Sequence, residues 1–187
     1  RLWEKLCKKE ILFLLPEDPG YPERLKDIPD APFALYMKGD KQAAKAFSKN
    51  VPVAAVVGAR ECSEYGKAVA EEIGKCCARL GIALSSGMAY GIDGIAQSAA
   101  LRGGGLVAAV LGCGCDICYP ESNGGLYKRL SEQGCIFSEY IPGTEPKANY
   151  FPPRNRIISG MADVLIVVEA KEKSGTLITV DMALEQG

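Results

Sequence analysis

The segment Phe151-Pro-Pro-Arg-Asn-Arg156 places two guanidinium groups where a helix is expected to begin. Proline at the first helical positions favours a helix start, and the apolar residues that follow would form the buried side of that helix. A helix start already carries about half a positive charge, so Arg154 and Arg156 need an anion close to them. That anion is either a carboxylate, such as Asp163 or Glu169, or a bound phosphate.

Short loops rich in glycine, serine and threonine follow several apolar runs of the sequence. Such loops bind phosphate through backbone amides at helix starts, although any single one of them can be a simple cap or tight turn. Ser174-Gly-Thr176 is the clearest example, because it directly precedes an apolar helical pattern. Several such loops together with Arg60, Arg154 and Arg156 favour an anion site over capping alone. The loops are Gly58–Arg60 with Ser63 and Tyr65, Ser85–Gly87 through Asp93, Gly112–Gly114 with Tyr119 and Pro120, Ser138–Glu139, and Lys173–Thr176.

The elements that position these loops alternate regularly between strand and helix. Short apolar runs predict strands, and longer amphipathic stretches between them predict helices. The strands are expected at 53–57, 82–85, 106–111, 135–137 and 164–168, and the helices near 65–80, 92–102, 123–133, 153–162 and from 176 onward. This pattern predicts an α/β fold with a doubly wound, mostly parallel sheet and helices on both faces. Right-handed connections bring every strand-to-helix loop to one edge of the sheet, so the ligand site is expected along that edge.

Residues 1–50 have a different organisation and are expected to form a small N-terminal extension. They begin in what resembles the end of a helical module, followed by apolar runs at 11–15 and 33–37 and helical stretches at 21–28 and 40–49. The main domain is then expected to span residues 51–187. Because the sequence stops within a helical pattern, this domain is expected to be truncated at its C-terminus.

Composition excludes several classes of protein. The net charge of −1 and the pI of about 5.7 are not those of a strongly basic nucleic-acid binder, so an anion site would be a local patch. No apolar run approaches the ~20 residues that span a bilayer, and the N-terminus lacks the apolar segment of a signal peptide. These features predict a soluble, cytoplasmic protein without membrane contact.

The eight cysteines, in a chain without a secretion signal, predict reduced thiols. Cys113, Cys115 and Cys118 have a spacing that could hold zinc or iron. No fourth ligand lies nearby and the chain has no histidine, so no metal site is expected.

Catalytic and cofactor-binding motifs are also missing from the sequence. The G-x-x-x-x-G-K-[ST] loop of nucleoside triphosphatases is absent, and the first predicted strand is followed by Gly58-Ala-Arg60 instead of the dinucleotide-binding G-x-G-x-x-G. There is neither a histidine base nor a G-x-S-x-G elbow. The chain is therefore expected to bind a ligand without catalysis and without a cofactor.

Six motifs occur in the order in which the DNA-processing protein A family, DprA or Smf, carries them, and the sequence resembles that family. They are Gly58-Ala-Arg60 with Ser63-Glu-Tyr-Gly66, Ser86-Gly-Met-Ala-Tyr-Gly-Ile-Asp93, Gly112-Cys-Gly114 with Tyr119-Pro120, Ser138-Glu139, Phe151–Arg156, and Ser174-Gly-Thr-Leu-Ile-Thr179. The resemblance implies a Rossmann-like domain that binds single-stranded DNA without sequence preference. It also implies a homodimer that helps to load RecA recombinase on incoming DNA in natural transformation.

The resemblance assigns residues to this interface position by position. The arginine of the family's first turn corresponds to Arg60, and its Arg-Asn-Arg corresponds to Arg154, Asn155 and Arg156, of which Arg156 is the one more expected to hold the fold. Aromatic rings can stack on bases, and Phe151 is the first candidate, followed by Tyr65 and Tyr150. The complete expected interface is Arg60, Ser63, Tyr65, Ser86, Gly87, Lys147, Phe151, Arg154, Asn155, Arg156, Lys173, Ser174, Gly175 and Thr176.

Two departures from related sequences bear on function. The family often reads Ala-His where this chain has Ala96-Gln97, which argues against an essential histidine. Phosphoribohydrolases of similar fold carry a glutamate where this chain has Thr179, and a hydroxyl cannot act as the ionised base. Such an enzyme, using Glu139 or Glu169 instead, and a non-catalytic nucleotide sensor remain alternatives.

Overall fold

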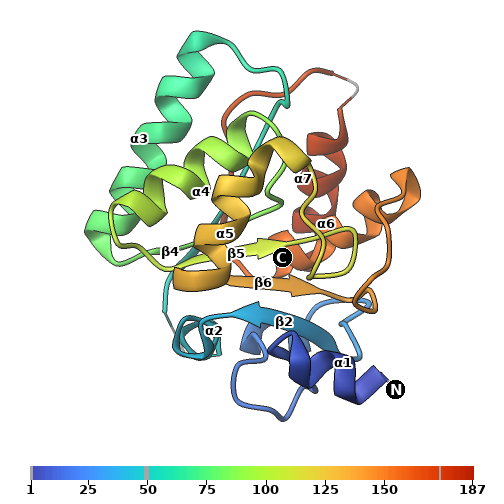
Figure 1. The fold of residues 1–187 in the computed structure, drawn as a ribbon. Helices are drawn as coiled ribbons and strands as arrows, with labels where there is room; N and C mark the ends of the chain where they lie inside the picture. The colour runs from blue at the N-terminus through green and yellow to red at the C-terminus, as the bar shows by residue number, and fades with distance from the viewer. Residues whose placement is uncertain (1, 49–50, 173) are drawn as a thin grey trace.

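The computed structural model describes residues 2–48, 51–172 and 174–187, which form a seven-stranded sheet with helices on both faces (Figure 1). The strands are β1 (Ile11–Leu14), β2 (Leu35–Gly39), β3 (Val53–Val57), β4 (Ala83–Ser86), β5 (Val107–Val110), β6 (Cys135–Ser138) and β7 (Val164–Val167). The α-helices are α1 (Leu2–Lys8), α2 (Lys41–Phe47), α3 (Glu64–Leu80), α4 (Ile92–Arg102), α5 (Gly124–Gln133), α6 (Phe151–Gly160) and α7 (Gly175–Gln186). Short 3-10 turns lie at Glu23–Lys26, Glu121–Asn123 and Ala148–Tyr150.

The strand order is β1-β2-β6-β5-β4-β3-β7, and the five strands from β3 to β7 are parallel to one another. The chain runs from β3 outward through β4 and β5 to β6, and then returns through α6 to place β7 on the other side of β3. This reversal makes the sheet doubly wound, as the sequence predicts.

The first two strands extend the same sheet. β2 lies antiparallel to β6, with Tyr36 opposite Ser138, and β1 lies antiparallel to β2. The expected N-terminal extension therefore contributes strands to the main sheet.

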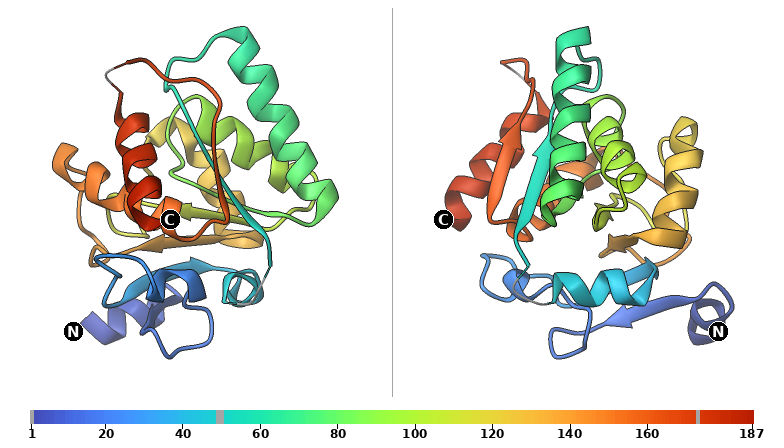
Figure 2. Two further views of the ribbon diagram at one scale, coloured as in Figure 1. Left: turned by 180° about the vertical axis from the view of Figure 1, so that it is seen from behind. Right: turned by 90° about the vertical axis from the view of Figure 1, so that its left-hand side faces the viewer.

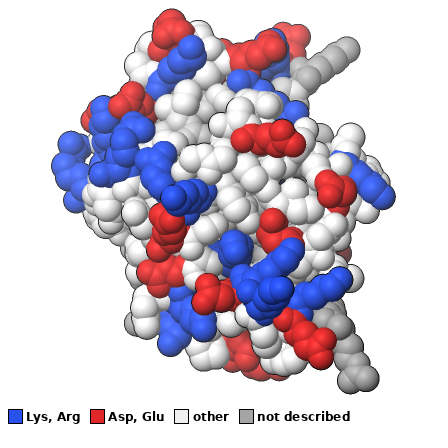
Figure 3. All heavy atoms as spheres, in the orientation of Figure 1, with Lys and Arg blue, Asp and Glu red and all other residues white. Residues whose placement is uncertain are grey.

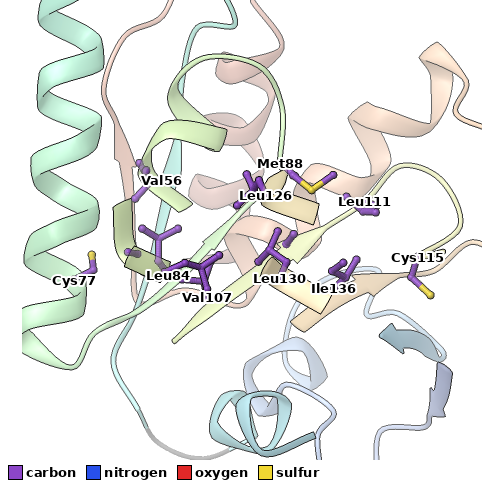
Figure 4. Close-up of a cluster of buried hydrophobic side chains, with 14 of the residues drawn as sticks. Val56, Cys77, Leu84, Met88, Val107, Leu111, Cys115, Leu126, Leu130 and Ile136 are labelled. Atoms are coloured by element: carbon purple, nitrogen blue, oxygen red, sulfur yellow. The ribbon is translucent and has the colours of Figure 1, made fainter. Parts of the chain in front are cut away.

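Two hydrophobic cores lie on the two faces of the sheet, because side chains alternate along each strand. On β3, Ala54 and Val56 belong to the core beneath α3, α4 and α5, whereas Val53, Ala55 and Val57 belong to the core beneath α2 and α6. Figure 4 shows the first core, with Leu84 and Val107 from the strands near Leu126 and Leu130 of α5. Viewed along the sheet, α3–α5 lie on one side of the parallel strands and α6 and α7 on the other (Figure 2).

The helix expected at residues 21–28 is only the 3-10 turn Glu23–Lys26. Proline at position 29 disfavours helical backbone at the preceding residue, which explains the early end of this helix. The helix expected at 40–49 spans Lys41–Phe47, with Asp40 as its N-cap. The main strands and helices otherwise lie within a few residues of the predicted ranges.

Charges of both signs are interspersed on the face covered by α3, α4 and α5, where each group of basic side chains has acidic neighbours (Figure 3). In the part of the chain that the structure describes, no helix is long and apolar enough to cross a membrane.

Candidate nucleic-acid interface

A crevice opens at the carboxyl ends of β3 and β7, where the connection after β3 leads to one face of the sheet and that after β7 to the other. Ligands of open α/β sheets bind at such a reversal of strand order. The crevice has a volume of about 600 Å³, which falls in the range of small-ligand pockets. The loop after β3, the start of α6 and the start of α7 line it, and the predicted site residues among its lining are Arg60, Phe151, Arg154, Asn155, Ser174, Gly175 and Thr176.

The guanidinium groups of two arginines lie near the ring of Phe151 at the edge of this crevice. The Arg60 guanidinium carbon is 5.9 Å from the ring centroid, and that of Arg154 is 5.7 Å from it. Tyr119 lies beside the same ring, with the two centroids 5.4 Å apart. Arg60 is exposed to solvent, whereas Arg154 is only 6% exposed. One ring is thus contacted by an exposed arginine and by a buried one.

The hydrogen-bond partners of Arg154 are other groups of the protein. Its Nη1 donates to the carbonyl oxygens of Gly87, at 3.1 Å, and of Val110, and its Nε donates to Asn155 at 3.1 Å. A Cβ at Gly87 would lie 2.8 Å from the Arg154 guanidinium and 2.9 Å from the Asp93 carboxylate, so glycine is needed for these groups to approach. Asp93 is the carboxylate that most strongly stabilises the charge of Arg154, and neither Asp163 nor Glu169 takes this place.

Burial lowers the pKa of Arg154 to about 10, partly offset by the negative charge of Asp93, so the guanidinium stays charged at neutral pH. Burial raises the pKa of Asp93, although Arg154 and the N–H of Gly87, which donates to the carboxylate at 3.0 Å, act in the opposite direction. Asp93 and Arg154 both line the crevice.

Arg156 also has an internal partner. Its two terminal nitrogens donate to the two carboxylate oxygens of Glu139 at 2.7 and 2.8 Å, and its Nε donates to the carbonyl of Asp30 at 2.9 Å. Glu139 directly follows β6, so this paired contact ties α6 to the end of that strand. Arg156 does not line the crevice.

The start of α3 is occupied by a carboxylate of the protein itself. Glu169 accepts hydrogen bonds from the N–H of Ser63 at 3.0 Å and from its hydroxyl at 2.9 Å. The Ser63 hydroxyl in turn accepts from the N–H of Gly66 at 3.0 Å and caps the helix. Tyr65, in the first turn, is 77% exposed. Ser63 therefore holds an internal anion in this structure.

The start of α7 has no such partner. Ser174 precedes the helix without a capping side-chain hydrogen bond, and no acidic residue lies in the first turn. Among the described residues, nothing bonds the buried hydroxyl oxygen of Ser174. Lys171 lines the crevice nearby, whereas Lys173 lies outside the described residues. This helix start faces the crevice with its charge uncompensated, as an anion site does.

The remaining predicted residues lie at or outside the edge of the crevice. The Ser86 hydroxyl is buried and donates to the carbonyl of Val56 at 2.6 Å. Lys147 is exposed, with its ammonium 5.6 Å from the ring centroid of Tyr150. Tyr150 also stacks on Tyr140 at 4.3 Å, so part of its ring is already covered.

Lys171 and Tyr90 are among the residues at this edge that the expected interface did not include. Lys171 lines the crevice, and Tyr90 lies just outside it. Both occur in loops that follow a strand, next to motifs that were selected, and this position is the signal that could have identified them.

The arrangement of Cys113, Cys115 and Cys118 is that of buried or partly buried free thiols. Burial raises the pKa of Cys113 to about 11 and that of Cys115 to about 12, which favours thiols, whereas metals bind thiolates. The sulfur atoms of Cys113 and Cys118 face the carbonyls of Ile117 and Pro120. Within the described ranges, no three Cys, Asp or Glu side chains are arranged to hold a metal ion.

The chain matches a family model described as DNA recombination-mediator protein A over residues 12–187. It is 39% identical to the protein Smf of Synechocystis over 182 residues, which are 97% of this chain and 46% of that protein. It spans about half the length of the curated relatives it matches.

Two solved structures resemble this fold closely. DNA processing protein A from Streptococcus pneumoniae superposes with a TM-score of 0.87 at 39% identity, covering 98% of this chain and 64% of that one. The protein of the same name from Helicobacter pylori, solved to describe its single-stranded DNA binding mode, gives 0.82 at 28% identity, covering 93% of this chain and 76% of that one. With this fold and the match over residues 12–187, the chain belongs to the DNA recombination-mediator protein A family, DprA or Smf.

Proposed function

We propose that this protein binds single-stranded DNA without sequence preference in the crevice between β3 and β7. The observation that carries the proposal is the open start of α7, which faces an exposed arginine and an aromatic ring across one crevice. The Helicobacter pylori relative, whose structure describes single-stranded DNA binding, supports the choice of ligand.

Each part of a nucleotide has a partner in this arrangement. A backbone phosphate fits the amides at Ser174–Thr176, where the positive end of α7 attracts an anion. Arg60, which is exposed, supplies a second contact, and Asn155 also lines the crevice. A base stacks on the Phe151 ring, since base–aromatic stacking tolerates any sequence.

The ligand is a single strand because stacking needs an unpaired base. In a duplex the faces of the bases are covered by their neighbours, so Phe151 would reach only the backbone. Beside glycines and hydroxyls the lining holds Arg60, Glu61, Lys171 and Asn155. Independence of sequence follows from stacking, because every base has a face that can stack on the Phe151 ring.

The wider role rests on family membership. We propose that the full-length protein acts as a recombination mediator that loads RecA on incoming single strands in natural transformation. It would do so in the cytoplasm and as a homodimer. Residues 51–187 would carry the DNA-binding domain, and residues 1–50 an extension to it.

A phosphoribohydrolase activity finds little support in the arrangement. Thr179 is 2% exposed and its hydroxyl donates to the carbonyl of Gly175 at 3.4 Å. The two carboxylates that could replace the missing glutamate are engaged elsewhere, Glu139 with Arg156 and Glu169 with Ser63. Neither lies free at the crevice to act as a base.

A salt titration with fluorescent oligo(dT) tests the proposal. We expect binding to weaken steeply with salt, and a duplex of equal length to bind less tightly. Arg60→Ala should weaken binding about tenfold and make the slope of log K against log salt less negative by about 0.7, the value for one phosphate contact on a single strand.

Arg79→Ala is the matched control, because Arg79 is exposed in the last turn of α3, at the other end of the helix from the crevice. It removes the same charge and should leave affinity and slope unchanged. Equal affinity for duplex and single strand, or an Arg60→Ala slope equal to that of the wild type, would contradict the proposal.

A further inference from the structure

A shallow hollow adjoins the crevice on the side of the loop between β4 and α4. Arg60, Tyr90, Tyr119 and Phe151 are among the residues that line it, and Tyr90 belongs to this hollow but not to the crevice. Its volume of about 20 Å³ is enough for one water molecule. A ligand group larger than a water molecule therefore does not enter this hollow and can only cover the residues at its rim.

The loop that carries Tyr90 is held by side chains on both sides. The N–H of Met88 donates to the Gln97 side chain at 3.1 Å. The Asn123 amide donates to the carbonyls of Met88 and Ala89 at 3.0 and 3.2 Å. The backbone before Tyr90 is thus fixed from α4 and from the 3-10 turn before α5.

The same loop contains two unusual backbone conformations. Met88 has a φ of 54°, although its side chain is completely buried, and such strain persists only where the surroundings enforce it. Gly91 has a φ of 71°, and a Cβ there would lie 2.3 Å from the carbonyl oxygen of Ala59 and 2.5 Å from that of Arg60. The loop therefore sits directly against the backbone of Arg60, which the proposed function places on a phosphate.

Tyr90 itself takes no part in holding this loop. Its side chain is 48% exposed, and within the described parts of the chain neither its hydroxyl nor its ring has a bonded or stacked partner. A rigid loop that presents an exposed aromatic ring loses little conformational entropy when a ligand covers that ring.

We propose that Tyr90, together with the exposed edge of Tyr119, forms a second base-stacking position next to the crevice. Its ligand is the base of the nucleotide adjacent to the one held by Phe151 and α7. The proposal rests on the proposed function of the crevice. A base is the expected ligand, because it can stack on the exposed ring of Tyr90 without entering the hollow, and Arg60 beside it favours a polyanion.

Replacing Tyr90 tests this position directly. Tyr90→Ala weakens oligo(dT) binding about tenfold, which is within the range for loss of one base–aromatic stack, and leaves the salt slope unchanged, because no charge is removed. Tyr90→Phe retains the ring and binds like the wild type. Phe33→Ala, which removes an exposed ring that lines neither the crevice nor the hollow, also binds like the wild type.

Photocrosslinking adds a readout that a general loss of affinity would not mimic. An oligonucleotide containing 5-iodouracil is irradiated with the protein, and the adduct is located by mass spectrometry. The expected adduct lies on Tyr90. It should be absent in Tyr90→Ala, which lacks the ring.

The outcomes separate this position from the crevice. Wild-type affinity in Tyr90→Ala together with adducts elsewhere overturns the second position and leaves the crevice intact. A changed salt slope in Tyr90→Ala also overturns it, because the effect would then act through Arg60. No salt-dependent binding by the wild type overturns the proposed function, and this inference with it.

Discussion

The helices α3 and α7 follow the neighbouring strands β3 and β7, and each begins after a serine, yet their starts are used differently. At α3, Ser63 caps the helix and binds the carboxylate of Glu169, which arrives from the end of β7. At α7, Ser174 makes no cap and its hydroxyl oxygen has no partner among the described residues. One helix start has a side-chain partner within the fold, and the other has none among the described residues, which is the property that the proposed function uses.

The difference shows that local sequence does not decide whether a helix start binds an anion. Both segments combine serine and glycine at a helix start, and either could cap or bind phosphate. The contact that distinguishes them joins Ser63 to a residue 106 positions away. The arginines follow the same division, since Arg154 and Arg156 have internal partners while Arg60 faces solvent.

The largest effect is expected from replacing Arg154, one of the two arginines with partners inside the protein. Arg154→Leu leaves Asp93 buried without its positive neighbour and two carbonyls without their donor. Removing one member of a buried charged pair costs about 3–5 kcal/mol, and the free energy of unfolding in urea should fall by that amount. Arg154→Leu/Asp93→Asn should recover part of the loss. A change below ~1 kcal/mol would place Arg154 with the ligand-binding groups instead.

A smaller effect is expected from giving α7 the carboxylate that α3 already has. A Cβ at Gly175 meets no atom within 4 Å, so Gly175→Asp is compatible with the backbone. The new charge should stabilise the helix start by about 0.3–1 kcal/mol and weaken oligo(dT) binding at least tenfold by repelling phosphate. Gly175→Ala is the control and should bind normally. Undiminished binding by Gly175→Asp would mean that phosphate does not use this helix start.

The smallest effect is expected from removing the negative charge of Glu169 at the start of α3. Glu169→Gln keeps an oxygen that can accept from Ser63 but removes the negative charge, so the free energy of unfolding should fall by about 1 kcal/mol. Thermal unfolding measures this change, and oligo(dT) affinity should stay the same or rise slightly. A clear loss of affinity would show that Glu169 helps the ligand site, and the contrast between the two helix starts would then fail.

The sequence predicted the main sheet well, because the strands β3 to β6 are largely apolar and completely buried, and β7 is a short apolar run. Val53–Val57 is an example, with all five residues buried. It also placed Arg60, Phe151 and Ser174–Thr176 together at one edge, since that follows from right-handed connections alone.

The partners of the arginines could not be predicted in this way. Glu139 reaches Arg156 across a loop, and Asp93 approaches Arg154 only because Gly87 leaves room between them. The choice among several carboxylates depends on tertiary packing, which no local pattern records. The antiparallel pairing of β2 with β6 was missed for the same reason, because nothing in residues 35–39 specifies a partner strand.

Gln97 gives the loop at Tyr90 a property that a histidine would not. Its carbonyl oxygen accepts from Met88 while its NH2 group donates to Ala108 at 2.9 Å, and neutral imidazole could reproduce both bonds in only one tautomer. Protonated imidazole has no acceptor, so acidification would break the bond to Met88. The amide of Gln97 does not titrate, so its bond to Met88 is independent of proton concentration for as long as the protein stays folded.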